Sequence, residues 1–129
     1  EHLEHLNETW EMLRELLTEK GMLIVAVPNC SSYDAGRYGE YWAAYDVPRH
    51  LWHFTPVTIQ QLASRHGFIM AARHPMPFDA FYVSMLSEKH RGSSCSFLKG
   101  MYAGTLAWFS TLGRKERSSS MIYVFRKKR

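Results

Sequence analysis

Cysteine is scarce in this sequence, and long apolar runs and glycine-rich turns are missing. The two cysteines, Cys30 and Cys95, lie far apart without a metal-ligand spacing, so we expect free thiols in a reducing, cytoplasmic compartment. No apolar run reaches the ~20 residues that a membrane-spanning helix needs. No Gly-x-Gly turn stands between a strand and a helix, so these residues do not predict a glycine-rich cofactor turn.

Positive charge is in modest excess and is concentrated at one end. The formal net charge is +4, and the basic residues gather in the segment 114–129. They are not interleaved with stacking aromatics, so we expect a solvated end and no nucleic-acid partner. A hydrophobic content of 46%, with 14% aromatic residues, is ample for a packed core.

The apolar run 21–28 is the segment around which the chain is organised. It is short, rich in β-branched residues and bounded by Gly21 and Pro28, which predicts a strand. Its continuous apolar character predicts that helices bury both faces of that strand. Ligands of open α/β sheets bind beyond the carboxyl ends of strands, so we expect the following segment, 29–55, to be a substrate-facing loop.

Capping residues and periodicity predict the other elements. Asn7 is a suitable N-cap for an amphipathic helix, and Thr55-Pro56 is a helix start with proline at the first helical position. We expect helices at 8–19, 56–66 and 97–112, strands at 21–28, 68–74 and 120–126, and a short helix at 81–86 before a polar loop at 88–94. No crossover helix leads into the last strand, so it can insert antiparallel beside its predecessor.

The helix expected at Phe97–Leu112 has a broad apolar stripe and a thin polar face. We favour a helix buried against the sheet or a partner domain. The alternative is a membrane-surface helix beside the basic segment 114–117, which would make the protein membrane-peripheral.

Three segments resemble a known enzyme family. They are Leu3-Glu4-His5-Leu6, the strand segment 20–29 (KGMLIVAVPN), and the segment 46–56 (DVPRHLWHFTP). Together they are similar to the C-terminal half of class I S-adenosylmethionine-dependent methyltransferases, in the bacterial group that carries LEHL and PRHxxHFTP segments.

The resemblance implies an α/β fold with a partial Rossmann-like methyltransferase sheet. The three strands expected here would be the last three of seven, with the final strand antiparallel and helices on the flanks. It also implies that S-adenosylmethionine is held mainly by the preceding half, so we do not expect tight cofactor binding by this chain alone. The chain begins at Glu1 without an initiator methionine, and we expect it to be part of a longer enzyme.

The resemblance assigns Glu4 and His5 to the cofactor side of the site, with His5 as a candidate base. An exposed histidine at a helix entry is the alternative. Arg49, His50 and His53 are the most suggestive cluster: Arg49 for an anionic acceptor group, and either histidine as base or orienting group. The alternative is a loop held by its own aromatics, with the histidines bonded to backbone. We expect no metal site, because no third ligand comes at a telling spacing.

Asn29, Tyr38, Trp42 and Tyr45 complete the candidate acceptor-binding residues. Asn29 stands just past the strand, and the aromatic residues lie in a loop with glycines. An ordinary packed loop and a turn-capping asparagine are the alternatives.

The sequence therefore predicts methyl transfer to a small-molecule, glycan-linked or lipid-linked acceptor. The alternative is a non-catalytic module that binds a protein or a membrane through Phe97–Leu112. An isolated half-sheet would expose a strand edge, so we also expect a homodimer or a segment swap.

Overall fold

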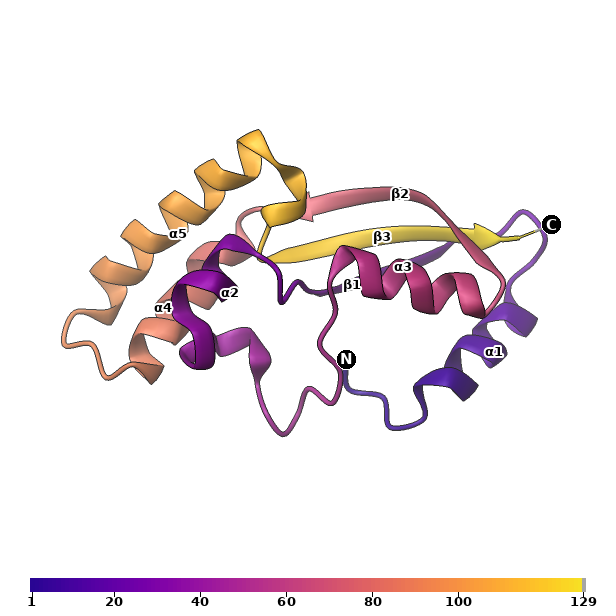
Figure 1. Cartoon of the computed structure of the whole chain (residues 1–129), viewed down its shortest axis with the longest axis horizontal. Helices are drawn as coiled ribbons and strands as arrows, with labels where there is room; N and C mark the ends of the chain where they lie inside the picture. The colour runs from indigo at the N-terminus through magenta and orange to yellow at the C-terminus, as the bar shows by residue number, and fades with distance from the viewer. Residues whose placement is uncertain (129) are drawn as a thin grey trace.

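The computed structural model describes residues 1–128, and Arg129 at the basic end lies outside them. Figure 1 shows an elongated molecule: α1 and α3 lie along the sheet, and α2, α4 and α5 gather beyond the end at which β1 and β2 stop. The helices are α1 Leu6–Leu16, α2 Tyr33–Tyr38, α3 Pro56–Arg65, α4 Asp79–His90 and α5 Ser96–Gly113, and the strands are β1 Leu23–Pro28, β2 Phe68–Met76 and β3 Ser120–Lys127. Short 3-10 helices cover Gly39–Tyr41, Ala43–Tyr45 and Lys115–Arg117.

The sheet has the order β1-β3-β2, and β3 runs antiparallel to both neighbours. Tyr123 of β3 stands opposite Val25 on one side and Arg73 on the other. The carboxyl ends of β1 and β2 therefore point the same way, although the two strands do not touch. The predicted mixed α/β fold with an antiparallel final strand is confirmed.

The prediction that both faces of β1 are buried is wrong. Val27 points into the core, whereas Ile24 is 64% exposed, and side chains alternate between the two along the strand. Within residues 1–128, β1 is an edge strand whose other edge pairs with no strand. One face packs on the core and the other does not, which is the pattern of a half-covered sheet.

Aromatic side chains form the core between the sheet and α1. The ring of Trp10 meets Phe68 and Phe125 edge-on, with centroid distances of 5.4 and 5.5 Å. Ile59 and Ala63 of α3 are buried in the same cluster. This geometry is favourable for aromatic pairs and joins α1, α3, β2 and β3 into one core.

Local signals set the start of α3 but not the limits of α1. Thr55 caps α3 in a capping box with Thr58, and α3 begins at Pro56 as the sequence predicts. The predicted helix 8–19 instead spans Leu6–Leu16. Asn7 lies inside the helix, whose N-cap position is His5, and its Oδ1 is bonded to the ring of His66 at 3.0 Å.

Three other predicted segments have different limits. The predicted loop 29–55 contains α2 and two 3-10 helices, and the short helix predicted at 81–86 extends over all of α4. The strand predicted to end at 74 continues through Pro75 to Met76. Proline is tolerated there because β2 is the other edge strand of this sheet.

The apolar stripe of α5 is not buried against the sheet, so that part of the prediction is wrong, and burial against a partner domain stays a prediction. α5 packs on α4 through its small residues: a Cβ on Gly100 would lie 2.5 Å from Cα of Met85, and one on Gly104 would lie 2.8 Å from Cα of Phe81. The large apolar side chains of α5 point away from this contact and are exposed: Phe97, Leu98, Met101, Tyr102, Phe109 and Leu112. No helix within residues 1–128 is both long enough and apolar enough to cross a bilayer.

Candidate functional site

A pocket of about 520 Å³ lies at the carboxyl end of β1, where Pro28 forms part of its wall. The 3-10 helix Ala43–Tyr45 and the middle of α4 supply apolar side chains to it. Polar side chains enter from two sides, Asp46, Arg49 and His50 from the loop after that 3-10 helix and Asp79, Tyr82 and His90 from α4. A concave apolar site with a few convergent polar groups is the usual form of a small-molecule site.

His50 is the mostly buried histidine of this pocket, and the structure fixes its tautomer. Its Nδ1 lies 2.8 Å from the carbonyl oxygen of Ala44, which can only accept, so Nδ1 carries the proton. In the neutral ring, Nε2 then carries the lone pair. Carboxylate oxygens of Glu1 and Asp46 lie 3.8 and 3.9 Å from Nε2. His50 is therefore an open acceptor beside two carboxylates.

Arg49 stands at the exposed rim and is already paired. Its Nε and Nη2 donate to Oδ1 of Asp46 at 3.1 and 2.6 Å. Asp46 holds a left-handed backbone conformation with φ of 40° at the turn. The predicted anion-binding arginine is present at the pocket, but an anionic acceptor group would have to share it with Asp46.

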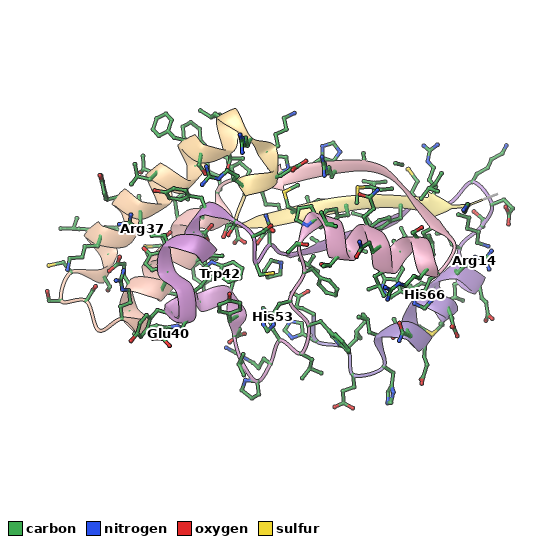
Figure 2. All side chains as sticks on the ribbon, viewed as in Figure 1. Arg14, Arg37, Glu40, Trp42, His53 and His66 are labelled. Atoms are coloured by element: carbon green, nitrogen blue, oxygen red, sulfur yellow. The ribbon has the colours of Figure 1, made fainter. Side chains whose placement is uncertain are left out.

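His53 follows His50 in the same loop but does not line the pocket that His50 lines. Its Nε2 donates to the carbonyl oxygen of Tyr45 at 3.0 Å, and its ring meets the Tyr45 ring edge-on at 5.1 Å. Figure 2 shows His53 on the segment that leads from the helical end of the molecule to α3. Of the two predicted loop histidines, only His50 lines the pocket.

Sequence analysis missed Glu1 and His2, which the structure brings to this loop. The backbone oxygen of Glu1 accepts from the amide of Leu51 at 2.8 Å, and Nδ1 of His2 bonds to the carbonyl oxygen of Arg49 at 3.0 Å. The rings of His2 and His50 meet edge-on at 4.6 Å. The triplet Glu-His-Leu occurs twice in succession at the start of the chain, so the sequence offered Glu1 and His2 as candidates alongside Glu4 and His5.

Glu4 and His5, the predicted residues from the second triplet, lie elsewhere. Both are exposed, and His5 precedes α1 with Nδ1 3.7 Å from Oε1 of Glu8. They line a separate, smaller hollow of about 200 Å³. The structure does not join them to the pocket that His50 lines.

Asn29 is fully buried and has no hydrogen-bonding position left for a ligand. Its Nδ2 donates to the carbonyl oxygens of Glu116 and Ser118, at 2.7 and 3.0 Å. Its Oδ1 accepts from the amide and hydroxyl of Ser31, at 3.1 and 2.7 Å. The amide group can form four such bonds and forms all four inside the chain. It ties the end of β1 to the segment before β3.

The predicted aromatic residues form mainly the interior of the helical end. Trp42 is 1% exposed and bonded to Asp34, and Figure 2 shows it among the helices of that end. The buried Tyr38 donates to Oε1 of Glu88 at 3.1 Å, and burial raises the pKa of its phenol. Trp42 and Tyr45 line a second hollow of about 530 Å³, which shares Asp46 and His90 with the first pocket.

Comparisons with known proteins extend the description of the fold. No family model matches the chain, and no curated protein matches it. A crystal structure of a "putative sarcosine dimethylglycine methyltransferase" from Galdieria sulphuraria superposes with a TM-score of 0.52 at 15% sequence identity. The match covers 98% of this chain and 49% of that chain. The chain has a methyltransferase-like fold. It spans about half the length of the solved structure that it matches.

Proposed function

We propose that this chain supplies the acceptor-facing half of a methyltransferase that uses S-adenosylmethionine. Three observations support the proposal: the methyltransferase-like fold, a match over half of a longer chain, and a pocket at the carboxyl end of β1. The observation that carries it is the hydrogen bond from His50 Nδ1 to the carbonyl oxygen of Ala44 at 2.8 Å, which leaves Nε2 of the neutral ring as a proton acceptor at that pocket. The cofactor-binding half would come from a segment outside this chain.

Methyl transfer needs few side chains from the acceptor-facing half. When bound, S-adenosylmethionine would supply an electrophilic methyl group to a nucleophile on the acceptor, and the electron pair of the broken carbon–sulfur bond would stay on the sulfur. The nucleophile loses its proton, and His50 Nε2 is the open acceptor that lines the pocket.

The pocket favours a small-molecule, glycan-linked or lipid-linked acceptor that carries charged groups of both signs. Arg49 offers a cation at the rim, and Asp79 offers a carboxylate on the α4 side. A volume of about 520 Å³ fits a small molecule or the terminal unit of a glycan or lipid-linked acceptor.

Calorimetric titration of the full-length protein with S-adenosylmethionine and with S-adenosylhomocysteine tests the proposal. We expect one equivalent of either ligand to bind the full-length protein, and weak or no binding by residues 1–129 alone. Absence of binding to a folded full-length protein would remove the proposal.

The exposed stripe of α5 favours a second candidate function, contact with an anionic membrane surface. The helix contains no Asp or Glu, most of its exposed residues are large and apolar, and basic residues (Arg114, Lys115) follow it directly. Apolar side chains beside positive charge suit the interface of an anionic bilayer.

Flotation with vesicles tests this second candidate. We expect binding to vesicles that contain phosphatidylglycerol, little binding to pure phosphatidylcholine, and loss of binding when Phe109 and Leu112 are both changed to Ser. Met12 is exposed on α1, so Met12→Ser is the matched control and should bind as the unchanged protein does. Equal loss in both variants, or self-association through α5 without vesicle binding, would refute the membrane assignment.

A further inference from the structure

Three side chains, of which His50 lines the pocket, bring metal-ligating atoms close together. Glu1, His2 and His50 each offer one such atom, and these atoms all lie within 4.8 Å of one another. Oε1 of Glu1 is 3.8 Å from Nε2 of His2 and 3.8 Å from Nε2 of His50. We propose that Glu1, His2 and His50 form a binding site for a divalent transition-metal ion, with Zn²⁺ as the best fit.

The hydrogen bonds of the two rings are the main evidence. Nδ1 of His50 donates to the carbonyl oxygen of Ala44 at 2.8 Å, and Nδ1 of His2 donates to that of Arg49 at 3.0 Å. A carbonyl oxygen cannot donate, so each Nδ1 holds the proton and each Nε2 presents a lone pair. Metal-binding histidines commonly donate their second ring nitrogen to a carbonyl or carboxylate in this way, which orients the ring and fixes the tautomer.

The backbone holds the three groups in place from two distant parts of the sequence. The amide of Leu51 donates to the backbone oxygen of Glu1 at 2.8 Å, and the indole of Trp52 donates to that of Leu3 at 2.7 Å. The Glu1 and His50 side chains are mostly buried, whereas that of His2 is largely exposed. Only one of the three ligands therefore needs substantial ordering when an ion binds.

The spacing requires a small contraction. Donor atoms about 2.0–2.1 Å from a tetrahedral Zn²⁺ lie roughly 3.3 Å apart. The separations of 3.8 Å from Glu1 to each histidine exceed this value by about 0.5 Å, and the separation between the two histidine nitrogens is at most 4.8 Å. The exposed His2 side chain and the Glu1 carboxylate would have to shift toward His50 to reach this spacing.

The side chains around the three ligands determine whether a further ligand is available, and the types of ligand determine which ion fits. Oδ2 of Asp46 lies 3.9 Å from Nε2 of His50 and can act as a further oxygen ligand. Arg49 opposes a cation, but its guanidinium is paired with the other oxygen of Asp46. Two imidazoles with carboxylate suit Zn²⁺ and similar ions, whereas Mg²⁺ and Ca²⁺ prefer oxygen ligands alone.

A cation at this site would use the lone pair of His50 that proton acceptance also needs, so the two roles compete. Metal binding itself does not depend on methyl transfer and is measured without the methyl donor. Failure of the metal site would leave the proposed methyltransferase function open, and the reverse also holds.

The experiment is a calorimetric titration with Zn²⁺, with Co²⁺ absorption as a second readout of ligand geometry. The protein carries no histidine tag and its α-amino group is blocked, so that neither adds a ligand. We expect one equivalent of Zn²⁺ to bind. Glu1→Gln and His2→Gln should each weaken binding at least about tenfold, the scale on which even outer-shell partners of a metal act.

His5→Gln is the matched control, because His5 occupies the same place in the second Glu-His-Leu triplet but lies outside the cluster. It should leave binding unchanged. His50→Gln should abolish binding, and circular dichroism checks its fold because the bond to Ala44 is lost. No binding to the unchanged protein, unchanged binding in Glu1→Gln and His2→Gln, or equal weakening in His5→Gln would overturn the proposal.

Discussion

The indole Nε1 of Trp42 donates a 2.8 Å hydrogen bond to Oδ2 of Asp34, and both side chains are buried. The same oxygen accepts from the hydroxyl of Ser119 at 2.6 Å. One carboxylate thus joins α2, the segment after it and the start of β3. A buried carboxylate that satisfies two buried donors is costly to remove, because both donors are then left without a partner.

Asp34→Ala should therefore lower the free energy of unfolding by about 2–4 kcal/mol, since two buried donors lose their acceptor. Urea denaturation followed by tryptophan fluorescence measures the change. Glu15→Ala, at an exposed position of α1, is the control and should change stability by less than about 0.5 kcal/mol. Equal effects of the two substitutions would contradict the role of Asp34.

Glu88 should make stability depend on pH in the acid range. The hydroxyl of Ser93 bonds to the Glu88 carboxylate and holds the pKa of the group below its usual 4.5, against the opposing effect of burial. Because the folded pKa is the lower one, the stabilisation is present above the unfolded pKa and is lost as pH falls through the folded pKa. We expect Glu88→Gln to lose less stability than the unchanged protein between about pH 6 and about pH 3. Urea midpoints across that range test this, and parallel curves would refute it.

Gly100 should not tolerate even one added methyl group. A Cβ there would lie 2.5 Å from Cα of Met85, so α4 and α5 would have to separate. Gly100→Ala should cost about 1–3 kcal/mol, the range for overpacking. Gly36→Ala is the control, because a Cβ at Gly36 meets nothing within 4 Å; it should be neutral or stabilising. Thermal unfolding compares the two, and a neutral Gly100→Ala would show that the two helices are not in close contact.

The free edge of β1 should cause the isolated chain to associate. Ile24 is exposed on this strand, and within the described residues only β3 pairs with it. Sedimentation and light scattering should detect dimers or swapped forms. Ile24→Lys should reduce association, because a charged side chain on an edge strand opposes pairing with a second strand. The substitution should leave the fold intact, since the side chain already faces outward. A monodisperse monomer at high concentration would contradict this expectation.

Elements that depend on short-range chemistry were predictable from sequence. Thr55 and Pro56 mark the start of α3 because a cap and a first-turn proline act within a few residues. The antiparallel final strand has no such short-range signal; the long excursion before it allowed this direction, the family resemblance implied it, and the pairing confirms it. The exposed stripe of α5 was not predictable, because periodicity identifies an apolar face without showing what covers it. The small residues that contact α4 occupy the opposite face and carry the packing.

The features of the candidate site likewise divide into those that the sequence predicted and those that only the tertiary structure decided. Sequence alone determined that polar groups would gather after β1, and His50 and Arg49 do line the pocket there. Only the tertiary structure decided that His53 bonds to Tyr45 and that Asn29 is fully used within the chain. It also decided between two identical Glu-His-Leu triplets. A triplet has the same local chemistry wherever it occurs, and the loop that returns from far along the chain places His50 beside the first of the two.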